Sequence, residues 1–126
     1  MTPRETVEMF IDAWNRMAWG RVTEMVTQDC VYHNIPMQPV TGPDGVRGVI
    51  ESMGEIKGVD WKITNIAENG NVVLTERVDC FAFASGQLLE IAVMGTFEVE
   101  DGKISAWRDY FDLGQFMAQM QGGQSS

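Results

Sequence analysis

Residues on which several common kinds of site depend are scarce in this sequence. Its 126 residues include one histidine, His33, and two cysteines, Cys30 and Cys80, which lie far apart and form no CxxC pair. A single histidine excludes a histidine-based catalytic triad and a metal site with several histidine ligands. The chain also lacks a P-loop, a GxGxxG fingerprint and a GxSxG elbow. We therefore expect no metal ion and none of these nucleotide or nucleophile sites.

Basic residues and long apolar runs are also scarce. Nine Lys and Arg against 18 Asp and Glu give a net charge of −9, and the basic residues are scattered along the chain. This balance argues against nucleic acid or an anionic membrane as the main partner. No apolar run approaches the length of a membrane span, and no signal-peptide pattern opens the chain. Together with two cysteines expected to stay reduced, these features predict a cytoplasmic protein.

The sequence does contain enough apolar material for one folded domain. Hydrophobic residues make up 44% of the chain and charged residues 21%, which is ordinary for a globular protein. We expect one domain over residues 1–120 and a flexible tail over residues 121–126.

The first part of the chain is predicted to be mainly helical. Thr2 and Glu5 have the spacing of a capping box with a proline between them, and apolar residues then recur every three or four positions. The segment CVYHNIP looks extended and stops at its proline. The expected helices cover residues 3–18, residues 21–27 and a third stretch that starts near Pro43.

From residue 59 onward the pattern changes to strands and tight turns. The segments DWKITNIAE, VVLTERVDCFAF, LLEIAVMGTFEVE and KISAWRDYFD are separated by Asn69-Gly70, Ser85-Gly86 and Asp101-Gly102. Short turns of this kind predict an antiparallel meander. Residues 113–120 could add a last helical turn or two. The expected fold is α+β, with N-terminal helices packed on a curved mixed or antiparallel sheet that forms a cone with an internal pocket.

The last strand is predicted to carry a carboxylate on its inner face. One parity holds Trp107, Asp109 and Phe111, which makes it the more apolar one. That parity should face inward and take Asp109 with it. A buried carboxylate needs a cation, and Arg77 is the best-placed strand cation if its own face is inward.

The segment TERVDCFAF is apolar on both faces, so alternation alone does not show which face is inside. Covering both faces requires helices on one and another subunit on the other, which predicts a homodimer through the outer face of the sheet. With Arg77 inside, it would lie between Asp79 and Asp109. Tyr32 and Asn34 share a parity in the extended segment and would converge on the same place. The expected pocket wall consists of Leu89, Ile91, Val93, Trp107 and Phe111.

Two readings of this polar cluster remain open from the residues alone. It is either an active site or a buried ion network that only orders the core.

Three motifs resemble those of the limonene-1,2-epoxide hydrolase family. They are YHNIPM, TERVD and GKISAWRDYFDLG, in that order and at compatible spacing. The resemblance implies the cone fold of the nuclear transport factor and ketosteroid isomerase superfamily. It places the family's arginine and acid on Arg77 and Asp79, its base on Asp109, and its water-holding pair on Tyr32 and Asn34.

The resemblance also implies a reaction, the cofactor-independent addition of water to an apolar epoxide, terpene-like or otherwise cyclic, to give a vicinal diol. Asp109 would take a proton from the water and protonated Asp79 would give one to the epoxide oxygen. Two other functions compete with it on the same fold. One is a ketosteroid isomerase or polyketide cyclase-like enzyme, and the other is a module that binds an apolar ligand.

Overall fold

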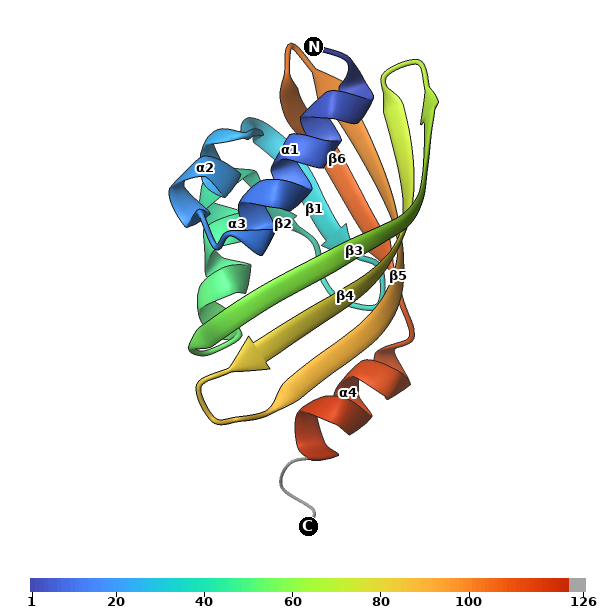
Figure 1. The fold of residues 1–126 in the computed structure, drawn as a ribbon. Helices are drawn as coiled ribbons and strands as arrows, with labels where there is room; N and C mark the ends of the chain where they lie inside the picture. Colours follow the sequence, from blue (N-terminus) through green and yellow to red (C-terminus); the bar gives the residue numbers. More distant parts are fainter. Residues whose placement is uncertain (123–126) are drawn as a thin grey trace.

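The computed structural model describes residues 1–122 (Figure 1). The helices are α1 (Pro3–Asn15), α2 (Trp19–Glu24), α3 (Gly42–Ser52) and α4 (Leu113–Gly122). The strands are β1 (Val26–Asn34), β2 (Val40–Thr41), β3 (Ile56–Asn69), β4 (Val72–Phe83), β5 (Leu88–Glu100) and β6 (Lys103–Tyr110). No helix among these residues is long and apolar enough to cross a membrane.

The first helix begins as predicted, and the first two helices both end earlier than predicted. The Thr2 hydroxyl accepts a hydrogen bond from the Glu5 backbone N–H at 3.1 Å, and the Glu5 carboxylate accepts one from the Thr2 N–H at 2.8 Å. α1 stops at Asn15 rather than at residue 18, because Met17 adopts a left-handed backbone with φ 54°. α2 occupies 19–24 instead of 21–27, and Val26 already belongs to β1.

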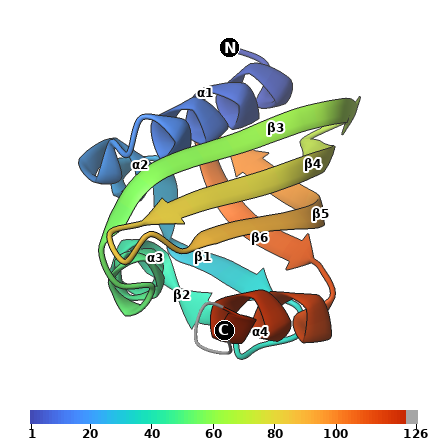
Figure 2. The same ribbon diagram turned by 60° about the horizontal axis from the view of Figure 1, so that its bottom comes forward.

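The sheet has six strands in the order β2-β1-β6-β5-β4-β3. Strands β3 to β6 form the predicted antiparallel meander, while β1 pairs in parallel with β6. Figures 1 and 2 show β3, β4 and β5 bending across the molecule, with α1, α2 and α3 on one side and α4 near the end of the chain. This confirms the expected α+β fold with helices on a curved mixed sheet.

Two of the predicted turns show how glycine sets the sheet register. At the β5–β6 turn, Asp101 and Gly102 both have positive φ, 50° and 76°, as a type I′ hairpin requires. At the β3–β4 turn, Asn69 pairs with Val72, so the loop consists of Gly70 and Asn71 rather than of the predicted Asn69-Gly70. Gly70, the first loop residue, has positive φ and Asn71 does not, and the turn lies one residue later than predicted.

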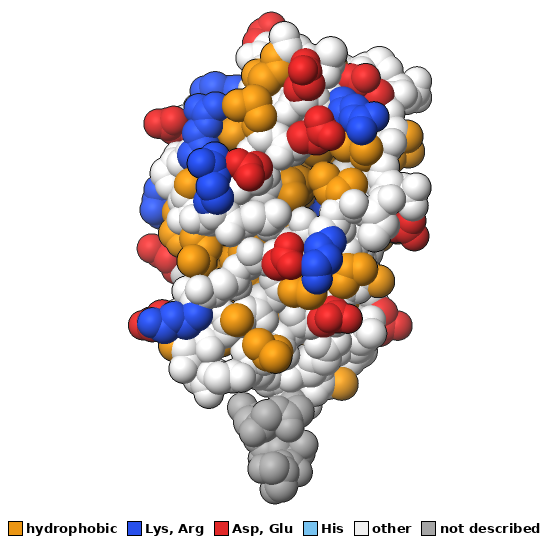
Figure 3. Space-filling model, in the orientation of Figure 1, with side chains coloured by type: hydrophobic (Ala, Val, Ile, Leu, Met, Phe, Trp, Pro, Cys, Tyr) orange, Lys and Arg blue, Asp and Glu red, His pale blue; other side chains and the backbone are white. Residues whose placement is uncertain are grey.

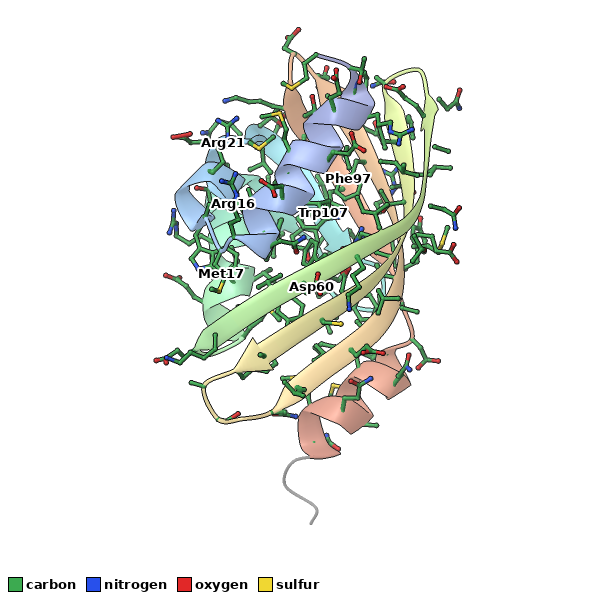
Figure 4. All side chains as sticks on the ribbon, in the orientation of Figure 1. Arg16, Met17, Arg21, Asp60, Phe97 and Trp107 are labelled. Carbon is green, nitrogen blue, oxygen red and sulfur yellow. The ribbon has the colours of Figure 1, made fainter. Side chains whose placement is uncertain are left out.

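Aromatic side chains fill the space between α1 and the sheet. Phe10 contacts Phe97 and Trp107 edge to face, with ring centroids 6.2 and 5.1 Å apart. Phe97 and Trp107 lie between the helices and the strands in Figure 4.

On the face shown in Figure 3, Lys and Arg side chains lie among Asp and Glu, with hydrophobic side chains between them.

The end of the chain differs in part from the predicted tail. α4 runs through Gly122, so the first two residues of the tail expected over 121–126 are helical. Residues 123–126 lie outside the part of the chain that the structure describes.

Candidate active site

A buried guanidinium joins two carboxylates at the centre of the sheet. Arg77 binds Asp79 through Nε at 3.0 Å and Nη2 at 2.8 Å, and binds Asp109 through Nη2 at 3.1 Å and Nη1 at 3.3 Å. Its remaining N–H donates to the Thr75 hydroxyl at 3.0 Å. All five guanidinium donors therefore have acceptors, which buried Arg requires. Arg77, Asp79 and Asp109 are 1%, 4% and 3% exposed.

The alternation of β4 and β6 brings these groups to one face. Arg77 and Asp79 are two residues apart on β4, so their side chains point the same way. Asp109 lies on β6, and β5 separates the two strands. Arg77 reaches across β5, and its guanidinium lies 5.0 Å from the Trp61 ring and 5.8 Å from the Phe97 ring. Aromatic faces favour a cation at that distance.

The parallel pairing of β1 with β6 places the remaining two polar residues, Tyr32 and Asn34, beside the Arg77 cluster. Tyr32 lies opposite Trp107, and Asn34 lies opposite Asp109. The Tyr32 hydroxyl donates to the Asn34 side-chain oxygen at 3.2 Å. Tyr32 also stacks on Trp107 with ring centroids 3.8 Å apart, and the Trp107 indole N–H donates to Asp109 Oδ1 at 2.9 Å. The structure thus places Tyr32 and Asn34 on the strand next to Asp109.

Burial and charge set the ionisation of these groups in opposite directions. Burial raises the pKa of Asp79 to about 6, helped by the nearby Asp109 carboxylate and opposed by Arg77. Burial also raises the pKa of Tyr32, with Asp109 adding to the effect, so the phenol stays protonated. For Arg77, burial acts to lower the pKa, but the two carboxylates outweigh it and the net pKa is raised. The site therefore holds a permanent cation, Arg77, beside an acid, Asp79, that keeps its proton to a higher pH than an ordinary aspartic acid does.

The cluster lies at the wall of a cavity of about 380 Å³. Asp79, Asp109, Tyr32 and Asn34 line it, whereas Arg77 lies behind the two carboxylates. The other lining residues are almost all apolar: Trp14, Met37, Val49, Ser52, Met53, Trp61, Phe81, Leu89, Ile91, Val93, Phe111, Phe116 and Met120. A cavity of this size and composition is typical of a small-molecule site.

Four of the five residues expected in the pocket wall line the cavity, namely Leu89, Ile91, Val93 and Phe111. Trp107 does not. It is fully buried, its ring stacks on Tyr32, and its indole N–H donates to Asp109. The alternation rule placed it on the correct face, but the Tyr32 ring covers it.

Sequence reasoning missed several parts of the site. Trp14 and Trp61 line the cavity from α1 and β3, and Met53 does so from the position immediately after α3. Phe116 and Met120 do so from α4, and their i, i+4 spacing in LGQFMAQM was a signal for one apolar helix face. Nothing in the sequence indicated that the Thr75 hydroxyl would bind Arg77, except that both residues face the same side of the strand.

No group of three or more His, Cys, Asp or Glu in residues 1–122 is arranged to hold a metal ion. The two carboxylates that line the cavity are both bonded to Arg77.

Comparisons with known proteins give the family. Residues 1–121 match the family described as the limonene-1,2-epoxide hydrolase catalytic domain. Epoxide hydrolase EphG of Mycobacterium tuberculosis is 36% identical over 108 residues, which cover 85% of this chain and 71% of that protein.

Solved structures agree on the fold. The structure of a Mycobacterium tuberculosis LEH-like epoxide hydrolase has a TM-score of 0.81 at 31% identity, covering 95% of this chain and 90% of that chain. A Catenulispora acidiphila protein with a ketosteroid isomerase-like fold has a TM-score of 0.79 at 20% identity, covering 94% and 93%, which shows a shared fold alone. These findings confirm the resemblance carried by the three sequence motifs, and this chain belongs to the limonene-1,2-epoxide hydrolase family.

Proposed function

We propose that this protein adds water to small apolar epoxides, cyclic or terpene-like, and releases vicinal diols. The observation that carries the proposal is the pair of carboxylates, Asp79 and Asp109, held by one guanidinium at the wall of an apolar cavity. Opening a strained ring needs a nucleophile at carbon and a proton at oxygen at the same time. Two carboxyl groups in different environments supply both.

In the proposed step, Asp109 removes a proton from a water molecule held by Tyr32 and Asn34. The water oxygen forms a bond to one ring carbon while the carbon–oxygen bond at that carbon breaks. Protonated Asp79 gives its proton to the departing oxygen, so both hydroxyl groups of the diol are formed together. Asp109 then carries the extra proton, which returns to Asp79 before the next turnover.

Arg77 bears on this assignment in two ways. Its charge lowers the pKa of Asp79, yet burial and Asp109 together keep that pKa near 6. A raised pKa suits an acid that works near neutral pH. Arg77 also stays between the carboxylates throughout, so it stabilises whichever of them is ionised at each stage.

Two rival functions use the same cavity. An isomerase or polyketide cyclase-like enzyme would move a proton beside a carbonyl, and a binding module would hold an apolar ligand without reaction. Arg77 counts against the isomerase, because an enolate site gains little from a carboxylate already paired with arginine. Five converging polar side chains are more than an apolar-ligand module needs. Incubation with cyclic and aryl epoxides and with a 3-ketosteroid, followed by product analysis, separates the three.

A single turnover in heavy-oxygen water tests the mechanism. With enzyme in excess over epoxide, we expect the diol to carry the label from the first turnover, because water attacks carbon directly. A carboxylate nucleophile would instead form an ester, and the first diol would carry an unlabelled oxygen from aspartate. Unlabelled first-turnover diol would overturn the one-step mechanism.

We also propose that the protein is a homodimer through the outer face of the sheet. Val31, Leu74, Met94 and Tyr110 lie on that face and are 44%, 43%, 50% and 46% exposed. Apolar side chains gathered on a sheet face favour a covering partner, and a second copy presents the same surface. Sedimentation should give a dimer, and Met94→Lys should shift it toward monomer. A wild-type monomer at micromolar concentration would contradict this proposal.

A further inference from the structure

Every inward-facing residue near the middle of β5 is large and apolar except one. Leu89, Ile91, Val93 and Phe97 share this face with Gly95, and all are buried. Gly95 is not among the residues with positive φ, so its backbone does not require glycine. Glycine within a strand is destabilising relative to alanine, because it loses more backbone freedom on folding. Its presence therefore calls for a packing reason.

The packing reason is the path that Arg77 takes across the sheet. Gly95 pairs with Thr75 of β4 on one side and with Asp109 of β6 on the other. A Cβ atom at position 95 would lie 2.3 Å from Arg77 Nη1, 2.7 Å from Asp109 Oδ1 and 3.0 Å from Thr75 Oγ1. The first two distances are too short for any side chain. The guanidinium and the carboxylate thus occupy the space that a side chain on β5 would fill.

We propose that Gly95 is a positioning residue for the reaction, since it opens the passage by which one arginine bridges an acid on β4 and a base on β6. This inference rests on the proposed function for its catalytic meaning. Its structural part concerns only the Arg77–Asp109 contact. Thr75 completes the passage, because its hydroxyl accepts from Arg77 Nη1 and donates to the Gly95 carbonyl at 3.3 Å.

Gly95→Ala is the direct test, and Gly58→Ala is its matched control. Gly58 is also a strand glycine, on β3, but a Cβ there would meet only Ala82 Cβ at an ordinary 3.7 Å. Gly95 does not line the cavity, so we expect KM for an epoxide to stay within about threefold. A displaced base should lower kcat about 100-fold. Gly58→Ala should keep both constants.

A spectroscopic readout without substrate separates this inference from the proposed function. The Trp107 indole N–H donates to Asp109, whereas those of Trp14 and Trp61 have no hydrogen-bond partner among the described residues. In ¹H–¹⁵N spectra, Gly95→Ala should move the Trp107 indole signal, identified from Trp107→Phe, and Gly58→Ala should leave it in place. This result stands even if the wild-type protein turns over no epoxide.

A second pair of variants keeps the test decisive if Gly95→Ala unfolds. Lysine at position 77 retains a cation but lacks the forked Nη1 atom that lies over Gly95. The loss of thermal stability caused by Gly95→Ala should therefore be much smaller in the Arg77→Lys background than in the wild type. Equal losses in both backgrounds, or an unmoved Trp107 signal with wild-type kcat, would overturn the inference.

Discussion

The floor and the rim of the cavity are built in opposite ways. The floor consists of Tyr32, Asn34, Arg77, Asp79 and Asp109, all carried by β1, β4 and β6 within the sheet. Each guanidinium donor is bonded, and the surrounding strands pair on both sides. The charged part of this floor has one arrangement, because moving Arg77 or either carboxylate leaves a buried charge without a partner.

The rim consists of Phe116 and Met120 on α4, Val49 on α3, and Met53, which directly follows α3. α4 is held to β5 by the Gln119 side chain, which accepts from the Glu90 N–H at 2.8 Å and donates to the Glu90 carbonyl at 2.7 Å. Methionine adapts to irregular shapes because it is unbranched. For the proposed function, this difference means that the sheet fixes the positions of the reacting groups. The rim side chains, which tolerate substitution, determine which substrates fit.

Removing either floor carboxylate should have the largest effect. In the proposed mechanism Asp79→Asn removes the proton donor and Asp109→Asn removes the base, so each should lower kcat by about 10³-fold or more. Asp60→Asn is the matched control, because Asp60 is an exposed carboxylate on β3. Initial rates of diol formation measure the effect. A variant at either floor position that keeps a tenth of the activity would show that the two carboxyls do not act as a unit.

The floor should also make stability depend on pH through Asp79. Its pKa rises from an ordinary 3.8 to about 6 on folding, so the folded state binds the proton more tightly. The stability from this proton is complete below about pH 4 and is lost as pH rises through about 6. We expect the free energy of unfolding of the wild type, relative to Asp79→Asn, to fall by about 3 kcal/mol between pH 4 and pH 8.

Urea unfolding of both proteins across that range measures the difference. Asp60→Asn, which removes an exposed carboxylate, should follow the wild type. A difference between wild type and Asp79→Asn that is constant, or that grows as pH rises, would show that folding does not raise the pKa of Asp79.

Sequence reasoning reaches the floor more easily than the rim, and the reason is periodicity. A strand side chain has two possible faces, so the shared parity of Trp107, Asp109 and Phe111 is enough to predict that Asp109 lies inside. The same rule does not show that Tyr32 covers Trp107, because that stacking depends on the parallel pairing of β1 with β6. Local patterns carry no information about pairing between distant strands.

The rest of the cavity wall is harder to predict than the floor, because it comes from three helices and a distant strand. Apolar spacing identifies Trp14 as part of an amphipathic helix, but not as a residue that lines a cavity. Gly95 has a signal in the sequence, as a glycine among large apolar residues of one parity. Its meaning requires the positions of Arg77 and Asp109 on the neighbouring strands. The end of the first helix is mispredicted for a local reason, the left-handed Met17.

Loosening the rim should have a moderate effect. Gln119→Ala removes both hydrogen bonds to Glu90, and β5 there has no β6 partner, since their pairing begins at Met94. We expect KM for an epoxide to rise about three- to tenfold with kcat nearly unchanged, because α4 no longer holds Phe116 and Met120 over the cavity. Gln115→Ala, an exposed glutamine on the same helix, should leave both constants unchanged. A fall in kcat at constant KM would place α4 in the chemistry instead of the rim.

His33→Ala should have the smallest effect and marks the boundary of the floor. His33 lies between Tyr32 and Asn34 on β1 but points to the opposite face of the sheet, beside Arg108. Its Nε2 donates to the Met37 carbonyl at 2.9 Å, so its loss should cost about 1 kcal/mol of stability. We expect kcat/KM within about twofold of the wild type, whereas the neighbouring Tyr32→Phe, which removes one of the proposed contacts to the reacting water, should lose about tenfold or more. A large loss in His33→Ala with normal thermal stability would mean that the chemistry extends through the sheet to its outer face, and that the floor is not confined to one side of β1.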